Sequence, residues 1–406
     1  MNDKRLGRQT VALAHPPSVL SFSNIGGKFE GQGPLADFFD EISNDSFFGE
    51  KTWEKAESAM QKTVLQRALE KAELTPEDLD YILAGDLLNQ CIGSSFGLRD
   101  FRVPFYGLYG ACSTMGESLS LASLLIDGGY ADRAAALTSS HFCTAERQYR
   151  MPVPYGSQRT PTAQWTTTAA GCTILGSDGP GPYVTHVTCG RIVDKGITDA
   201  NNMGAAMAPA AYDTLSAFFR DTGYKPADFD LILTGDLGEL GHAIVRDFFQ
   251  RDGVDMGPQF QDCGLLLYDR KHQDMHAGAS GCGCSASVLN GYLLRKMREG
   301  KWKTILFAPT GALLSPTSSG QGESIPSICH AVRLSAVREQ LVNLYKFRIN
   351  FWRIQQISCE ERVLTLSVYR GKVFSIKGKG ACETISQTPL PVFVPRRGVT
   401  RGRRPW

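Results

Sequence analysis

The sequence predicts an α/β fold made of two duplicated halves. Asp80-Tyr-Ile-Leu-Ala-Gly-Asp-Leu87 is repeated as Asp230-Leu-Ile-Leu-Thr-Gly-Asp-Leu237, and similar polar turns precede both segments. A second match follows in the same order, because the segment that begins at Gly110 resembles the one that begins at Gly281. The chain of 406 residues is long enough for a duplicated fold, and 42% hydrophobic with 21% charged residues is typical of a soluble globular protein.

Each half alternates between helix and strand. Amphipathic stretches predict helices, and the continuous apolar runs predict short strands that are covered on both faces, as in a layered parallel sheet. The expected helices are 53–72, 110–127, 210–222 and 281–299, and the expected strands lie within 80–87, 134–138, 230–237 and 304–308. The apolar helix faces carry Ala56, Ala59, Met60, Val64 and Leu65 in the first half and Leu215, Phe218 and Phe219 in the second.

The charge distribution marks a boundary near the C-terminus. The net charge of the whole chain is +2, but residues 333–406 hold 15 Lys and Arg against four acidic residues. We therefore divide the chain into a first half at 1–190, with capping loops at 141–170, a second half at 191–334 and a basic tail at 335–406. The tail is either an extension that binds a membrane surface or a partner, or out-of-frame, disordered sequence. Its abrupt change of composition favours the second interpretation.

Composition excludes several classes of protein. A net charge of +2 gives no reason to expect nucleic acid as a partner. Eleven scattered cysteines do not form a secreted disulfide pattern, which favours free thiols in a reducing compartment. No apolar run is long enough to span a membrane, and the polar N-terminus does not resemble a signal peptide. The spacing in Cys282-Gly-Cys284 does not suit a zinc site, so no metal is expected. No phosphate-binding loop and no dinucleotide-binding glycine motif occurs, so no cofactor is expected.

Cys112 is the candidate nucleophile. It opens the helix that follows Gly110, where backbone N–H groups and the helix dipole stabilise a thiolate. Small neighbours, including Ser113, leave room for a ligand. Asp86 and Asp236 end the two repeated strands, and we expect each to cap the loop that follows it.

A duplicated α/β chain with a cysteine at the start of a buried helix resembles the thiolase superfamily. The resemblance implies a layered αβαβα fold with a ligand cleft between the halves. His276, in His-Ala-Gly-Ala-Ser-Gly281, is similar to the catalytic histidine loop of thiolases. The second proton-handling group is missing, because neither 310–315 nor 235–239 supplies the expected cysteine or histidine, and His242 comes too late. This favours ligand binding over carbon–carbon bond chemistry, with Cys112 and His276 as vestigial residues.

A polar segment after the strand at 134–138 is the candidate binding surface. Ser140, His141, Arg147 and Arg150 gather where the fold places its cleft. Guanidinium groups and helix N-termini suit a carboxylate ligand, although a solvated loop with surface arginines remains the alternative.

Several motifs in order resemble the stage V sporulation protein AD family over about residues 8–332. They are Ala-Gly-Asp-Leu-Leu-Asn-Gln at 84–90, Gly-Ala-Cys-Ser-Thr at 110–114, Thr-Ala-Glu-Arg-Gln-Tyr-Arg at 144–150, Met-Ala-Pro-Ala at 207–210 and Thr-Gly-Ala-Leu-Leu-Ser-Pro-Thr at 310–317. The resemblance implies a non-catalytic spore protein that binds dipicolinic acid (pyridine-2,6-dicarboxylate), free or as its calcium chelate. The expected ligand-binding residues are Asn89, Cys112, Ser113, Ser140, His141, Arg147, Arg150 and His276.

The same resemblance implies partners and a location. The family works with membrane-embedded proteins of its operon to load dipicolinate into the developing spore, at the spore inner membrane. Attachment to that membrane would be peripheral. Relatives of the superfamily usually dimerise through the sheet edge of the first half, so a homodimer is expected. The alternative function is an acyltransferase of the 3-oxoacyl synthase or thiolase type that uses Cys112 and His276.

Overall fold

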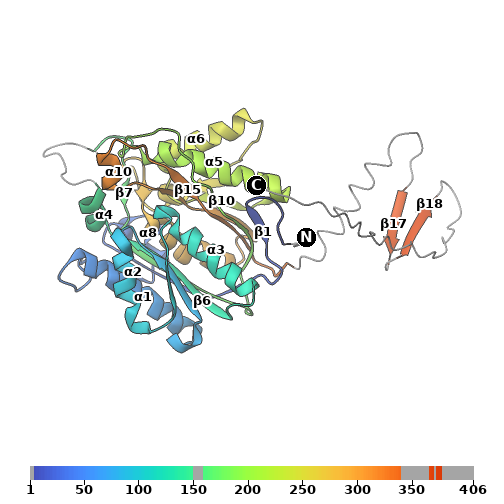
Figure 1. Ribbon diagram of the computed structural model, residues 1–406, viewed down its shortest axis with the longest axis horizontal. Coiled ribbons are helices and arrows are strands. Elements are labelled where there is room, and N and C mark those ends of the chain that lie inside the picture. Colours follow the sequence, from blue (N-terminus) through green and yellow to red (C-terminus); the bar gives the residue numbers. More distant parts are fainter. Residues whose placement is uncertain (1–3, 150–158, 340–364, 370–371, 377–406) are drawn as a thin grey trace, which may run out of the picture. The chain divides into compact units, whose positions relative to one another are not determined.

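A computed structural model describes residues 4–149, 159–339, 365–369 and 372–376 of the chain (Figure 1). The chain divides into two compact units, Met1–Leu341 and Val342–Trp406. In the second unit the described residues form one antiparallel pair, β17 (Thr365–Tyr369) and β18 (Lys372–Ile376). The other parts of the basic tail, 340–364, 370–371 and 377–406, lie outside the described residues, as does Arg150.

The first unit is built on a twelve-stranded sheet whose strand order is β11-β10-β13-β16-β9-β2-β8-β6-β4-β5, with β1 paired to β9 and β3 to β2. The strands are β1 (Thr10–Ala12), β2 (Ser18–Gly26), β3 (Glu41–Ile42), β4 (Tyr81–Gly85), β5 (Phe105–Gly107), β6 (Arg133–Ser140), β8 (Ala169–Gly176), β9 (Tyr183–Thr188), β10 (Leu231–Thr234), β11 (Phe260–Asp262), β13 (Thr304–Ala308) and β16 (Ala331–Ser335). Two smaller sheets pair β7 (Trp165–Thr166) with β12 (Ala279–Ser280) and β14 (Thr310–Ala312) with β15 (Ser327–Cys329).

The strand pairing confirms the duplication. In the first half the order β2-β8-β6-β4-β5 has two antiparallel pairs followed by two parallel pairs. In the second half β9-β16-β13-β10-β11 repeats the same sequence of pairings. Because β9 is the counterpart of β2, the second half begins before Tyr183 and not at residue 191, where the sequence analysis placed it.

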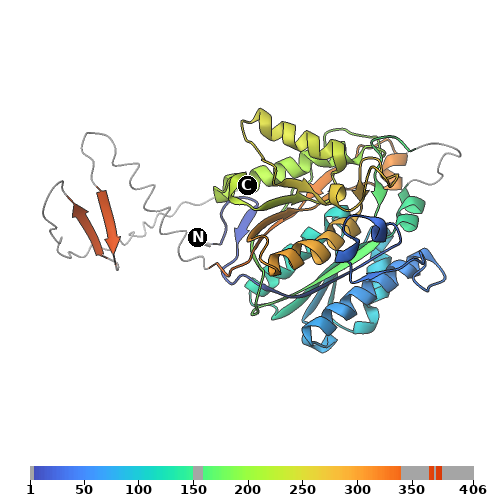
Figure 2. The ribbon, with the colours of Figure 1, turned by 180° about the vertical axis from the view of Figure 1, so that it is seen from behind.

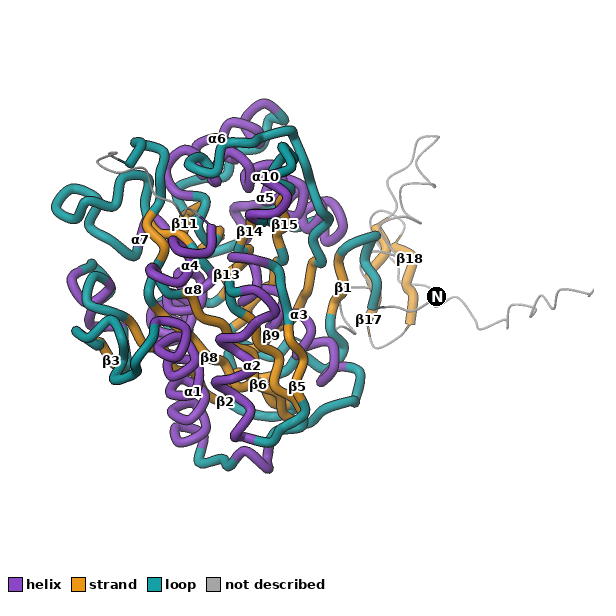
Figure 3. The backbone as a smooth tube through the Cα atoms, turned by 60° about the vertical axis from the view of Figure 1, so that its left-hand side comes forward, coloured by secondary structure: helices purple, strands orange, loops and turns teal. Residues whose placement is uncertain are grey.

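Helices cover the sheet in layers. The outer layers are α1 (Trp53–Ala72) with α2 (Ile92–Leu98) over the first half, and α5 (Met203–Thr222) with α6 (Gly238–Arg251) over the second (Figure 1). Between the two halves lie α3 (Thr114–Asp127) and the continuous run α8 (Cys282–Ser287), η8 (Val288–Leu293) and α9 (Leu294–Arg298), which is orange in Figure 2. Figure 3 shows helices on both sides of the strands. Because α1 packs on the first-half strands, α5 on the second-half strands, and α3 lies between the halves, the layered αβαβα arrangement is confirmed.

The remaining helices are short. They are α4 (Phe142–Tyr149), α7 (Cys263–Leu266) and α10 (Pro316–Gly320), and the 3₁₀ turns η1 (Glu30–Gln32), η2 (Ala36–Phe38), η3 (Pro76–Asp78), η4 (Asn89–Cys91), η5 (Arg99–Phe101), η6 (Ala111–Ser113) and η7 (Pro226–Asp228). None of the described helices combines the length and the apolar character needed to cross a membrane.

Local sequence explains the start of α1 but did not predict the start of α5. The α1 helix has the predicted bounds, and the Thr52 side chain caps its first turn by accepting from the Lys55 N–H at 3.3 Å. The α5 helix begins seven residues before the predicted residue 210, although Pro209 lies inside it. Met207 and Ala208 are completely buried, so packing keeps this turn helical in spite of the proline.

The first unit extends past the predicted boundary at 334. Arg333 on β16 is buried, and its two terminal nitrogens lie 2.7 and 2.8 Å from the carboxylate oxygens of Glu339. A buried guanidinium needs such a partner. Residues up to Glu339 therefore belong to the packed unit.

Candidate functional site

Cys112 lies in η6, one turn before α3, at the place where the two halves meet. The preceding residue, Ala111, has φ +49°, a left-handed conformation that a residue with a Cβ rarely adopts. Gly311 on β14 packs so closely that an added Cβ would overlap the carbonyl oxygen of Gly110. The turn that presents Cys112 is therefore fixed by its contact with the second half.

The thiol of Cys112 faces a carboxylate from the second half. Asp236 follows β10, and its carboxylate lies within electrostatic reach of the thiol. The same carboxylate accepts from the Gly281 N–H at 2.9 Å, from the Ser280 hydroxyl at 3.2 Å and from the Thr310 hydroxyl at 3.2 Å. Asp236 thus joins β12 and β14 at one buried point beside Cys112. The prediction that it caps its own loop was wrong, because the carboxylate of Asp262 accepts from the Leu237 and Gly238 N–H groups instead.

Burial decides the ionisation of this pair. It raises the pKa of Asp236 to about 7, although the interactions with Cys112 and Gly281 act in the opposite direction. Burial, and then the negative charge of Asp236, raise the pKa of the Cys112 thiol well above its usual range. The sequence analysis expected a thiolate stabilised by the helix start, and this was wrong, because desolvation and the neighbouring carboxylate outweigh the backbone N–H groups.

Cys282 is a second thiol, and it belongs to the same small cluster of buried residues as Cys112, Leu87 and Ala145. It opens α8, and its Sγ donates to the carbonyl oxygen of Ser139 at 2.8 Å. Burial raises its pKa well above the usual range as well. All nine cysteines in the described part of the chain are free.

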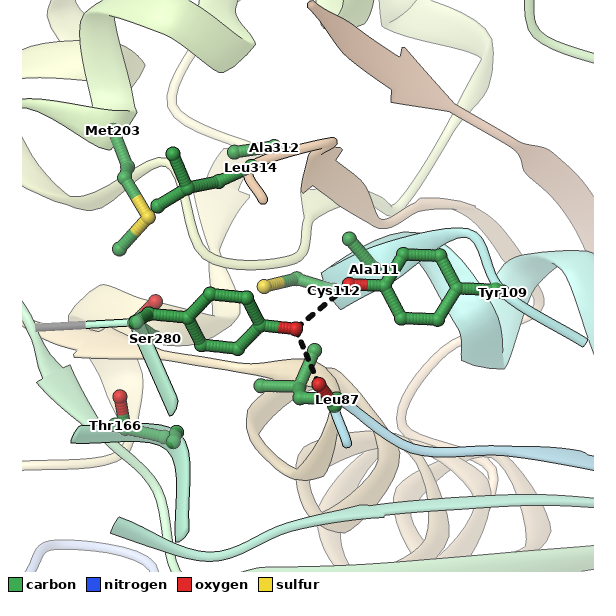
Figure 4. Close-up of a pocket in the computed structure, with 11 residues that line it drawn as sticks. Leu87, Tyr109, Ala111, Cys112, Thr166, Met203, Ser280, Ala312 and Leu314 are labelled. Carbon is green, nitrogen blue, oxygen red and sulfur yellow. Dashed lines mark hydrogen bonds between the residues drawn. The ribbon is translucent and has the colours of Figure 1, made fainter. Parts of the chain in front are cut away.

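A narrow pocket, the inner pocket, leads to Cys112. Figure 4 shows the thiol pointing into the space between Leu87 on one side and Met203 and Leu314 on the other. Tyr109, Tyr149 and Ala145 complete the first-half side, and the cavity volume is about 30 Å³. The lining is mostly apolar. Of the described residues that line it, none is Arg, Lys or His.

An outer pocket adjoins it. Asn89, Gln90, Ser315 and Pro316 line this second hollow of about 260 Å³, together with the same two tyrosines and Leu314. The hydroxyl oxygens of Tyr109 and Tyr149 lie 2.8 Å apart, and the Tyr149 hydroxyl also donates to the Leu87 carbonyl. The two phenols therefore stand where the pockets meet.

Two buried acidic residues, Glu57 and Asp86, act on the thiol of Cys282. Glu57 on α1 accepts from the hydroxyls of Ser139 at 3.0 Å and Thr144 at 2.8 Å. Burial and the charge of Asp86 raise the pKa of Glu57 to about 8. Asp86 accepts from the N–H groups of Leu88 and Ser94, which fits its predicted role in fixing the loop after β4.

The structure brings only some of the predicted site residues together. Cys112 lines the inner pocket and Asn89 the outer one. Two predicted serines are buried next to the site but are used in packing. Ser113 accepts from the His330 N–H at 3.0 Å, and Ser140 donates to the Thr167 carbonyl at 2.7 Å while accepting from the Gly283 N–H at 3.0 Å.

His141, Arg147 and His276 point elsewhere. His141 Nε2 donates to the Ser46 carbonyl at 2.8 Å, and Arg147 pairs with Glu54 and lies 5.2 Å from the Trp53 ring. The ring nitrogens of His276 lie 2.6 Å from the Thr160 carbonyl and 2.8 Å from the Asp274 carboxylate. None of the three is among the residues that line the inner pocket.

Periodicity on α4 explains the position of Arg147. Ala145 and Tyr149 are four residues apart and face the pocket together, so Arg147, two residues from each, lies on the opposite face.

The sequence repeat could have pointed to Asp236 as a residue of interest, since it is the counterpart of Asp86. Nothing in the sequence indicated that it would meet Cys112. Among the described residues no group of three or more His, Cys, Asp or Glu is arranged to hold a metal ion.

Comparison with known proteins identifies the family. Residues 7–335 match the family described as stage V sporulation protein AD. Stage V sporulation protein AD of Bacillus subtilis is 44% identical over 330 residues, which cover 81% of this chain and 97% of that protein. The chain belongs to the stage V sporulation protein AD family. This confirms the resemblance found in the sequence.

Solved structures show the fold of this family member. The 3-oxoacyl-[acyl-carrier-protein] synthase III of Aquifex aeolicus aligns with a TM-score of 0.50 at 14% identity, covering 79% of this chain and 99% of that one. A variant of OleA from Xanthomonas campestris aligns with a TM-score of 0.52 at 14% identity, covering 80% and 99%. At such low identity the likeness establishes the thiolase-like fold alone. Residues of this chain beyond 335, which make up most of the basic tail, lie outside the family match.

Proposed function

We propose that this member of the stage V sporulation protein AD family is a non-catalytic ligand-binding protein, which holds dipicolinate in the inner and outer pockets and takes part in its uptake into the developing spore. Family membership supports the sporulation role. The observation that carries the non-catalytic part is the partner of Cys112, which is the carboxylate of Asp236. All seven histidines lie in the described residues, and none lines the inner pocket.

A carboxylate is a poor activator of this thiol. Acyl transfer requires the thiolate, and an imidazole normally takes the proton. Here the negative charge of Asp236 opposes formation of a second negative charge on Cys112, and the thiol remains protonated. The alternative, an acyltransferase that uses Cys112 with His276, would require His276 to leave Thr160 and Asp274. Incubation with acyl-CoA tests it, because an acyl adduct on Cys112 detected by mass spectrometry would support the enzyme.

Charge indicates which form of the ligand the site favours. Free dipicolinate is a dianion, whereas its one-to-one calcium chelate is neutral. The described lining of the inner pocket has no cation, and the charge of Asp236 acts on Cys112. A dianion would meet repulsion in a poorly solvated space. We therefore propose that the chelate binds more tightly than the free acid, with calcium arriving only as part of the ligand.

The proposed location and partners of the protein are based on its family membership. We propose peripheral attachment to the forespore and spore inner membrane through the other stage V sporulation A-operon membrane proteins, and a homodimer formed at the first-half sheet edge. Strand β5 is that edge, and it exposes Phe105 and Tyr106. Nucleic acid is not a proposed partner.

Two variants on opposite faces of α4 would test where the ligand binds. Ala145→Phe fills the inner pocket, and Arg147→Ala removes the guanidinium on the opposite face of α4. Calorimetry with dipicolinate, with and without calcium, should show binding that weakens at least tenfold in Ala145→Phe and stays within about twofold in Arg147→Ala. The reverse result would move the ligand to the arginine face that the sequence first suggested. No heat with either ligand form in the wild-type protein would reject the proposed function.

A further inference from the structure

The two pockets share one wall. Tyr109 and Tyr149 line both the inner and the outer pocket, as does Leu314. Cys112 is only 5% exposed, while Tyr109 is 42% exposed. The phenols therefore stand between the solvent side and the thiol.

A chain of two hydrogen bonds holds Tyr109 and Tyr149 together, and the direction of each bond can be assigned. The Tyr149 hydroxyl donates to the Leu87 carbonyl, so its single proton is used there. The bond of 2.8 Å between the two phenols must then be donated by Tyr109 and accepted by Tyr149. Tyr149 takes part in both bonds of the chain and Tyr109 in one.

The phenols stay neutral in this position. Burial raises the pKa of Tyr109 to about 12 and moves that of Tyr149 still higher. Neutral hydroxyls can exchange their hydrogen bonds with each other for bonds to the oxygens of a small ligand. They do so without placing a charge beside the apolar inner pocket.

We propose that Tyr109 and Tyr149 form a gate that decides what reaches Cys112. A ligand first occupies the outer pocket beside Asn89, and its oxygen atoms take over the phenol hydrogen bonds as the rings separate. The class that passes is a small, flat molecule with hydrogen-bond acceptors at one end and an apolar edge that enters beside Cys112. The identity of this ligand rests on the proposed function, but the gate itself does not.

The rate of thiol alkylation measures the gate without any ligand. Full-length protein is treated with iodoacetamide at one fixed alkaline pH, and labelling of the Cys112 peptide is followed by mass spectrometry. Tyr149→Phe removes both bonds and should label about tenfold faster than wild type, and Tyr109→Phe removes one and should label about threefold faster. Tyr130→Phe, at a phenol that is 73% exposed away from the pocket, is the matched control and should not change the rate.

Two cysteines outside the pocket serve as internal controls, because they distinguish opening of the gate from a general loosening of the fold. Cys172 and Cys329 are completely buried outside the pocket and should label at wild-type rates in every variant. Equal Cys112 rates in Tyr149→Phe and wild type would overturn the gate, and so would acceleration that extends to Cys172 and Cys329. Because this readout needs no dipicolinate, a failed gate and a failed binding assay are distinguishable results.

Discussion

Replacing Asp236 by asparagine should remove a pH-dependent loss of stability. Asp236 is buried, and its folded pKa is raised from 3.8 to about 7. A raised carboxyl pKa means that the folded state prefers the protonated form. Stability is then fully present below the unfolded pKa and is lost as the pH rises through the folded pKa.

The size of the effect follows from the two pKa values. One pKa unit corresponds to about 1.4 kcal/mol. With 3.8 for the unfolded chain and about 7 for the folded protein, ionisation of Asp236 costs about 2 kcal/mol of stability between pH 5 and pH 7. Asparagine cannot ionise, and its amide oxygen can still accept from the Gly281 N–H. Any fixed cost of the substitution shifts the whole curve without changing its slope.

Thermal unfolding monitored by circular dichroism at a series of pH values provides the test. The difference in Tm between Asp236→Asn and wild type should move by a few degrees in favour of the variant from pH 5 to pH 7. Asp100→Asn, at an aspartate on the surface paired with Lys62, is the control and should follow the wild-type curve. Parallel curves for Asp236→Asn and wild type would show that the carboxyl is not desolvated, and the account of the Cys112 site would have to be abandoned.

Three further outcomes are expected. Glu57→Gln should also gain Tm relative to wild type as the pH rises, over a range that extends to about pH 8, since the pKa of Glu57 is raised to about 8; an unchanged difference across that range would contradict it. Gly311→Ala should lower stability by about 1–3 kcal/mol in urea unfolding, because its Cβ would overlap the Cys112 turn, whereas Gly320→Ala, with open space around it, should be nearly neutral. Sedimentation should show a dimer that Tyr106→Lys on the β5 edge dissociates and Tyr130→Lys does not, and a wild-type monomer would reject the dimer.

Local patterns predicted part of the architecture. The repeated strands and the apolar face of α1 each depend on neighbours in the sequence, and the structure places both as expected. Cys112 was also placed correctly at the start of α3, because small residues and a glycine before a helical pattern mark such a turn.

The contents of the site were predicted less well. Arg147 and His276 belong to segments that do approach the cleft, yet their side chains pair with Glu54 and Asp274. Side-chain direction depends on which helix face packs inward and on which partner lies within reach. For α4 the spacing of Ala145 and Tyr149 held that information, but it gains meaning only once the pocket is known.

The sequence by itself determined the duplicated fold, the family and the position of the thiol, because repeats and periodicity are written in consecutive residues. Only the tertiary structure decided that Asp236 would meet Cys112 and that two tyrosines would stand in front of it. These contacts join residues from both halves of the repeat and from distant segments of the first half. Their consequence, a protonated thiol, comes from burial, which is a property of the assembled layers and of no single segment.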